Sequence, residues 1–144
     1  MLHALQLLRA GRRDEAARAC RERLDHAPED VDALQLLGVI AGMGGDYEAA
    51  RQWLTRADAL RPRHPDILDN LARACRECGD PDAAKACSET AIAVAPTRSA
   101  SWYGLALAER RLGNKAAAMR CYHRVVELAL GLDAQDWTFL LVGF

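Results

Sequence analysis

A spacing of 34 residues recurs along this chain of 144 residues, and it limits the possible folds more than any other feature of the sequence. Three kinds of residue follow the spacing: a glycine, an alanine and a proline. Three separate columns with one period are hard to obtain by chance, and a fixed period of this size is typical of stacked repeats. The columns are Gly11, Gly45, Gly79 and Gly113; Ala16, Ala50, Ala84 and Ala118; and Pro28, Pro62 and Pro96.

Each column has a physical role in a pair of helices. Glycine tolerates the left-handed conformation that ends many helices, so the glycines indicate the turn inside each pair. Asp46, Asp80 and Asn114 follow glycines, and we expect their side chains to cap the next helix. We expect the same of Ser99, three residues after Pro96. Alanine fits where two helices approach closely. Proline ends the second helix of each pair because it lacks the N–H that continuation needs.

The chain is therefore expected to be all-α, a right-handed superhelical solenoid of antiparallel helix pairs. Short loops force neighbouring helices to be antiparallel. Apolar residues recur at i, i+3 and i+7 in the first helices, which places a buried stripe on each. The expected spans are 1–10 with 13–26, 31–44 with 47–60, 65–78 with 81–94, and 99–112 with 115–130.

These residues resemble the tetratricopeptide repeat family, whose pattern is Trp-x-x-Leu-Gly-x-x-Tyr, then Ala-x-x-x-Phe, then Pro. The resemblance covers about residues 1–130, as repeats at about 1–30, 31–64, 65–98 and 99–132. Ser88 and Glu109 depart from it, because the family usually has apolar residues there. The second repeat shows the pattern as Leu34-x-x-Leu37-Gly38-x-x-Ala41, Ala50-x-x-x-Leu54 and Pro62.

Residues 133–144 form a separate segment that follows the repeat array. Asp133 can open a helix in which four large apolar residues lie at i, i+3, i+4 and i+7. We expect this helix to cap the end of the stack, and docking of a second copy or of a partner is the alternative. Both ends look like cuts in a longer array, so we expect an excised domain or ends covered by self-association. The four residues are Trp137, Leu140, Leu141 and Phe144.

The resemblance implies a non-catalytic scaffold or adaptor that binds a protein partner. In similar proteins the first helix of each pair lines a concave face that holds a peptide, extended or helical. Two alternatives stay open: a substrate-recruiting or regulatory domain of a larger glycosyltransferase- or sulfotransferase-like enzyme, and a scaffold that self-assembles through its terminal helices. Family members that hold chaperone tails do so with residues matched here by Gln35, Val39, Asn70, Ala100 and Gly104. Only Asn70 fits, so that partner is not expected.

The repeat register predicts which side chains face this groove. One rim is acidic and the other basic, with apolar side chains between them, so arginines would bind carboxylates of the partner through bidentate hydrogen bonds. The same order of charges also complements the helix dipole, which is the alternative explanation. The expected groove residues are Asp32, Gln35, Val39, Met43, Asp66, Asp69, Arg73, Arg76, Tyr103, Leu107, Arg110 and Arg111.

Composition excludes several other functions. The 19 basic and 20 acidic residues give a net charge of −1, which does not favour a nucleic acid or an anionic membrane as partner. The N-terminus does not resemble a signal peptide, and no apolar run is long enough to span a bilayer. The five cysteines form no regular disulfide framework, so a reducing cytoplasm is the expected location.

The sequence also predicts no catalytic residue, metal or cofactor. Cys75 and Cys78 have the spacing of a zinc or redox pair, but a zinc site needs four ligands and no second pair exists. Cys75 falls on the buried stripe, where cysteine packs as a small apolar residue. The four histidines are scattered, and the run from Gly42 to Gly45 lacks the Lys-Ser/Thr of a phosphate-binding loop.

Overall fold

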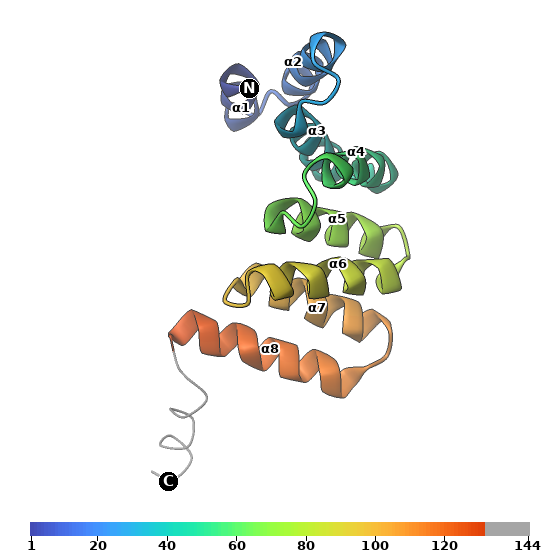
Figure 1. Cartoon of the computed structure of the whole chain (residues 1–144), viewed down its shortest axis with the longest axis vertical. Helices are drawn as coiled ribbons and strands as arrows, with labels where there is room; N and C mark the ends of the chain where they lie inside the picture. Colours follow the sequence, from blue (N-terminus) through green and yellow to red (C-terminus); the bar gives the residue numbers. More distant parts are fainter. Residues whose placement is uncertain (132–144) are drawn as a thin grey trace.

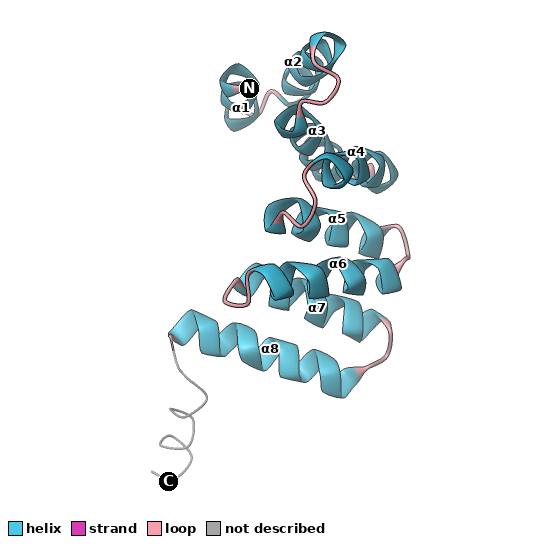
Figure 2. Cartoon of the chain, viewed as in Figure 1, coloured by secondary structure: helices cyan, strands magenta, loops and turns pink. Residues whose placement is uncertain are grey.

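The computed structural model describes residues 1–131, and this part of the chain consists of α-helices joined by short turns (Figure 2). Each expected helix agrees with the observed one to within a residue at either end, and the described residues contain no strand. The segment 133–144, expected to be a capping or docking helix, lies outside the described residues. The helices are α1 (Leu2–Arg9), α2 (Arg13–His26), α3 (Val31–Met43), α4 (Tyr47–Leu60), α5 (Pro65–Glu77), α6 (Pro81–Val94), α7 (Ser99–Arg111) and α8 (Lys115–Leu130).

The helix ends follow from the glycine and proline columns. Gly11, Gly45, Gly79 and Gly113 all have left-handed backbones, with φ between 77° and 84°, and each lies in the turn between the two helices of a pair. Side chains with a Cβ rarely adopt this conformation, which explains why glycine recurs there. The prolines of the third column each lie two residues beyond the end of α2, α4 or α6.

Two of the four expected N-caps are confirmed and two are wrong. Asp46 accepts a hydrogen bond from the backbone N–H of Ala49 at 3.1 Å, and Asp80 accepts one from Ala83 at 3.0 Å. Asn114 occupies the N-cap position of α8 without capping it, because its side-chain amide donates to Glu109 instead, at 2.7 Å. Ser99 is already the first residue of α7, one position past the N-cap.

The alanine column lies where the helices touch. Its four members are between 0% and 3% exposed, and a residue larger than alanine would push the helices apart. Gly38 of α3 permits a still closer approach, since a Cβ built there would lie 2.5 Å from Cγ of Leu54. The apolar stripes of α3 and α5, including Leu34, Leu37 and Leu68, are buried as the spacing predicted.

Successive pairs stack with a rotation from one pair to the next (Figure 1). In that view α1 and α2 are seen nearly end-on, whereas α5 to α8 lie across it. Each helix packs against the next along the chain, and α5 also packs against both α3 and α7. The first helices of the pairs therefore share one face of the stack. Within residues 1–131, every helix is too short or too polar to cross a lipid bilayer.

Candidate protein-binding groove

Three hollows follow one another along the face formed by α1, α3, α5 and α7. The N-terminal hollow lies between α1 and α3 and has a volume of about 290 Å³. The middle hollow, between α3 and α5, is smaller, at about 50 Å³. The C-terminal hollow lies between α5 and α7 and has a volume of about 410 Å³. We call the three together the groove, and nine of the twelve residues expected there line it: Asp32, Gln35, Val39, Met43, Asp69, Arg73, Arg76, Tyr103 and Leu107.

The N-terminal hollow is mainly apolar. Met1 and Leu5 line it from the start of the chain and from α1, and Leu36 and Val39 line it from α3. Asp32 is its one acidic residue, and its carboxylate accepts a hydrogen bond from Arg61 at 3.1 Å. This end of the groove therefore offers aliphatic surface and little unbalanced charge.

The C-terminal hollow is lined by an arginine whose side chain is largely buried and whose guanidinium group opens into the hollow. Arg76 of α5 is only 8% exposed, and its side chain makes no hydrogen bond within residues 1–131. Its nearest carboxylate oxygen belongs to Glu77 and lies 3.7 Å from Nε, which is an ion pair without hydrogen-bond contact. Burial lowers the pKa of Arg76, and the positive charges of Arg111 and Arg73 lower it further.

Glu77 is shared between two arginines. Arg111 donates from Nη2 to Glu77 at 3.3 Å and from Nη1 to the backbone carbonyl of Arg76 at 2.8 Å. Arg73 lines the same hollow, is exposed and forms no ion pair with the described residues. Three arginines thus lie in or beside this hollow, two of them paired with Glu77, while Asp69 is already paired with Arg98, so this part of the groove has an excess of positive charge.

The two acidic residues predicted on the third pair of helices, Asp66 and Asp69, are engaged within the chain. Arg98, from the turn before α7, donates from Nε to Asp69 at 2.6 Å and forms an ion pair with Asp66. Ser101 donates its hydroxyl to the other oxygen of Asp69 at 2.7 Å. These carboxylates join the third pair of helices to the fourth. Arg98 also occupies the N-cap position of α7, where its guanidinium group, which has no acceptor, cannot cap the helix.

The remaining expected residues fall in different places. Arg110 is exposed and lines none of the three hollows, and Arg111 lies beside the C-terminal hollow through its contacts with Arg76 and Glu77. Tyr103 is half exposed and tilts against the ring of Tyr122, with 6.1 Å between centroids. The four apolar residues expected to dock at the end of the stack, Trp137, Leu140, Leu141 and Phe144, lie outside the described residues.

Sequence reasoning missed three important side chains. Leu5 and Met1 belong to the same 34-residue columns as Val39 and Gln35, so extending the register one repeat toward the N-terminus would have identified them. Arg98 gave no such signal. It lies 29 residues from Asp69, its counterpart one repeat earlier is His64, and the contact depends on how two pairs stack.

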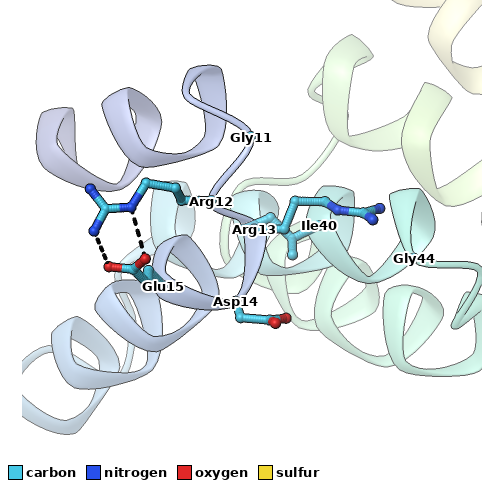
Figure 3. A pocket seen from close by; sticks show the side chains of 7 residues that line it. All are labelled: Gly11, Arg12, Arg13, Asp14, Glu15, Ile40 and Gly44. Atoms are coloured by element: carbon cyan, nitrogen blue, oxygen red, sulfur yellow. Dashed lines mark hydrogen bonds and ion pairs between the residues drawn. The ribbon is translucent and has the colours of Figure 1, made fainter.

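Another hollow, of about 360 Å³, lies outside the groove at the turn between α1 and α2 (Figure 3). Its charged side chains are used locally. Arg12 pairs with Glu15 through Nε at 2.7 Å, a contact that raises the pKa of Arg12, and Arg13 donates to the carbonyl of Met43 at 2.9 Å. The contact of Arg13 with Met43 joins the first two pairs, while that of Arg12 with Glu15 stays within α2, and we take the groove as the better candidate for a binding surface.

The cysteines form no disulfide within the described residues, and no three His, Cys, Asp or Glu side chains gather there as metal ligands do. Cys75 is buried on the α5 stripe, as its position predicted, and its thiol contacts that of Cys87 on α6. Cys78 lies apart near the end of α5, where burial raises the pKa of its thiol.

The sequence matches known proteins along most of its length. Three family models, each described as tetratricopeptide repeat, match residues 1–65, 43–105 and 99–131. Human tetratricopeptide repeat protein 7B is 29% identical over 140 residues, which is 96% of this chain. The chain spans 17% of the length of that relative.

Solved structures of MamA have the same fold. MamA from Desulfovibrio magneticus RS-1 superposes with a TM-score of 0.81 at 24% identity, covering 87% of this chain and 71% of that one. A second MamA crystal structure gives 0.82 at 20% identity, covering 89% and 75%. These similarities confirm the predicted helical solenoid. The 34-residue columns, the stacked antiparallel pairs and the three matching family models agree, and the chain belongs to the tetratricopeptide repeat family.

Proposed function

We propose that this chain is a protein-interaction scaffold that holds a segment of a partner, extended or helical, in the groove. The observation that most supports this is the line of three hollows along the first helices. Most of the residues predicted from the repeat register line one of these hollows. A continuous row of hollows can receive successive side chains of one segment, whereas a single pocket receives one. Membership of the tetratricopeptide repeat family supports the same general role.

The groove also offers groups that can pair with a peptide backbone. Gln35 lines the N-terminal hollow and Asn70 the middle one. A side-chain amide both donates and accepts hydrogen bonds, so each can satisfy the N–H and C=O of an extended chain. Apolar side chains of the segment would contact Val39, Leu107 and the ring of Tyr103, and burying this apolar surface would contribute to the affinity.

The test is a selection of random peptides on the whole chain, followed by measurement of the affinity of selected peptides for two matched variants. Met43→Glu places a charge in the groove, at a methionine that is 52% exposed. Met119→Glu makes the same change on α8, at a methionine that is 66% exposed and lines none of the three hollows. We expect a loss of at least about tenfold for the first variant and almost none for the second. Equal affinities would remove the groove as the binding site.

Self-association through the ends of the stack is a second candidate. The helices at the two ends of the described chain expose large apolar side chains, among them Leu2 of α1 and Val126 and Leu130 of α8. Exposed apolar groups of this kind favour contact with another surface. Light scattering coupled to size exclusion tests this candidate, since a mass that stays monomeric at all concentrations contradicts it. The length of the native open reading frame tests the remaining alternative, a recruiting domain within a larger enzyme.

A further inference from the structure

The two ends of the groove differ in chemistry, although they occupy the same repeat positions. Leu5, Val39, Arg73 and Leu107 form one 34-residue column along α1, α3, α5 and α7. The first two members give the N-terminal hollow its aliphatic wall, while Arg73 adds a positive charge to the C-terminal hollow. A segment that fills both hollows therefore meets aliphatic surface at one end and cations at the other.

At the C-terminal end of the groove, the guanidinium group of Arg76 has no hydrogen-bond acceptor within residues 1–131. A guanidinium group has five N–H donors, and a largely buried arginine normally uses several of them on acceptors of the protein. The side chain of Arg76 is largely buried and donates to none within residues 1–131, its nitrogens are accessible from the hollow, and its only nearby carboxylate is also held by Arg111. The group lines an open hollow of about 410 Å³. An anionic acceptor placed in that hollow would satisfy donors that the chain leaves without partners.

A single carboxylate fits the hollow better than a phosphate. Glu77 and Asp69 also line it, and they would repel a group with about two negative charges more strongly than a group with one. A C-terminal carboxylate is the alternative source. Of the five positions that match chaperone-tail binding in the family, only Asn70 has a fitting residue, so the groove lacks that arrangement. An Asp or Glu side chain within a segment is the remaining source.

We infer that the groove selects a two-part protein segment, with apolar side chains in the N-terminal hollow and an Asp or Glu carboxylate at Arg76 in the C-terminal hollow. This inference rests on the proposed function, since it describes the ligand of the same groove. Arg73, which is exposed on the same helix, adds a second cation to the acidic end. The apolar part provides buried area, and the carboxylate fixes the register of the segment.

The spacing between the two parts distinguishes an extended segment from a helical one. The N-terminal hollow lies between α1 and α3 and the C-terminal hollow between α5 and α7, so their centres are two helix-to-helix distances apart. At about 8–10 Å between the axes of packed helices, the distance between the two hollows is roughly 20 Å. An extended chain rises about 3.3 Å per residue and would need about six residues to cover it. A helix rises about 1.5 Å per residue and would need about thirteen.

The experiment uses a library of random 20-residue peptides, fused at the C-terminus so that no free carboxylate is present there, selected on the whole chain. We expect the binders to contain an apolar cluster and an Asp or Glu at one of the two spacings. Binders that are sensitive to Met43→Glu but show no enrichment of acidic residues would overturn this inference and leave the proposed function standing. Binders insensitive to Met43→Glu would instead overturn the proposed function.

Arg76→Met then tests the acidic contact directly, because methionine keeps much of the stem that packs in the core while removing the charge. We expect a loss of at least about tenfold in affinity for a selected peptide. Replacing the peptide's Glu by Gln should cause a similar loss in the parent and no further loss in Arg76→Met. Arg110→Met is the matched control, since Arg110 is an exposed arginine outside the hollows, and it should bind as the parent does. Equal binding by Arg76→Met and the parent would overturn the inference.

A charge swap keeps the test decisive if Arg76→Met fails to fold. Arg73 is exposed, so Arg73→Glu should leave the helices intact, which circular dichroism would verify. This variant should lose affinity for the acidic peptide and lose clearly less for the same peptide carrying Gln in place of Glu, because Arg76 stays in the hollow and only the attraction of a carboxylate is reduced. Equal losses for the Glu and the Gln peptide, or unchanged binding of both, would contradict a carboxylate at this end of the groove.

Discussion

Leu54 of α4 and Ser88 of α6 occupy the same position in successive repeats, and they show how the two halves of the molecule differ. Leu54 packs in the apolar core beside Gly38. Ser88 is just as buried, but its hydroxyl has no hydrogen-bond partner within the described residues. The difference extends to Glu109, a buried carboxylate at the position that Ala41 holds in α3.

The comparison teaches that the same two repeat positions can be filled with side chains of different volume and different polarity. Gly38 leaves room for a leucine at position 54, whereas the next repeat has Ala72 and the smaller Ser88 at the same two positions. Glu109 is accommodated because Lys85 and Asn114 hold its two oxygens, at 2.9 and 2.7 Å. The C-terminal half can therefore carry charge in its core and its groove, at a cost that depends on whether each polar group has a partner.

The largest effect on stability should come from truncating Leu54, whose position is taken by Ser88 in the C-terminal half. Leu54→Ala should lower the free energy of unfolding by about 3 kcal/mol, because a fully buried leucine leaves a cavity. Leu60→Ala on the same helix, at a leucine that is 42% exposed, is the control and should cost less than about 1 kcal/mol. Urea unfolding followed by circular dichroism measures both. Similar losses at the two positions would mean that the N-terminal core is loosely packed.

A smaller loss should follow from crowding the same site. Gly38→Ala would place a Cβ 2.5 Å from Cγ of Leu54, and the overpacking should outweigh the helix propensity of alanine and cost about 1–2 kcal/mol. Gly42→Ala, on the same helix, should stabilise by up to about 1 kcal/mol, since its nearest neighbour, Cβ of Ala50, is 3.9 Å away. In a Leu54→Ala background the Gly38→Ala penalty should largely vanish. A penalty that persists there would place the strain elsewhere.

In the C-terminal half, Glu109→Gln should cost about 1 kcal/mol at neutral pH by removing charge-assisted hydrogen bonds. Lys85, and then Asn114, lower the pKa of Glu109 in the folded chain below its ordinary value of 4.5. The stability from this carboxylate is therefore fully present above pH 4.5 and is lost as the pH falls through the folded pKa. Unfolding curves measured from pH 7 to pH 3 should show the parent losing its advantage over the variant. An advantage that stays constant with pH would contradict this account.

The smallest effect should have the opposite sign. Ser88→Ala removes a buried hydroxyl that has no partner, and it should raise the free energy of unfolding by about 0.5–1 kcal/mol. Ser101→Ala is the matched control. Ser101 is equally buried but donates to Asp69 at 2.7 Å, so this variant should be destabilised by about 1 kcal/mol. If both changes destabilise, an unseen partner such as a buried water satisfies Ser88.

Much of the fold could be predicted from the sequence because the determinants are local or repeat exactly. Gly45 and Gly79 mark the turns, Asp46 and Asp80 cap the next helices, and the helix spans followed to within a residue. Asn114 shows where this reasoning fails. It occupies the capping column, yet a buried carboxylate five residues earlier offers its amide a stronger partner, and no column of the sequence reveals that competition.

The sequence by itself determined the 34-residue unit, the eight described helices and the face on which the groove lies, because helix hydrogen bonds, caps and apolar spacing act over a few residues. Only the tertiary structure decided which charges remain available in that groove. Arg98 neutralises the acidic rim from 29 residues away, while Arg76 is buried with no acceptor within residues 1–131. Such contacts depend on the distance and rotation between stacked pairs, and no local pattern in the chain encodes these.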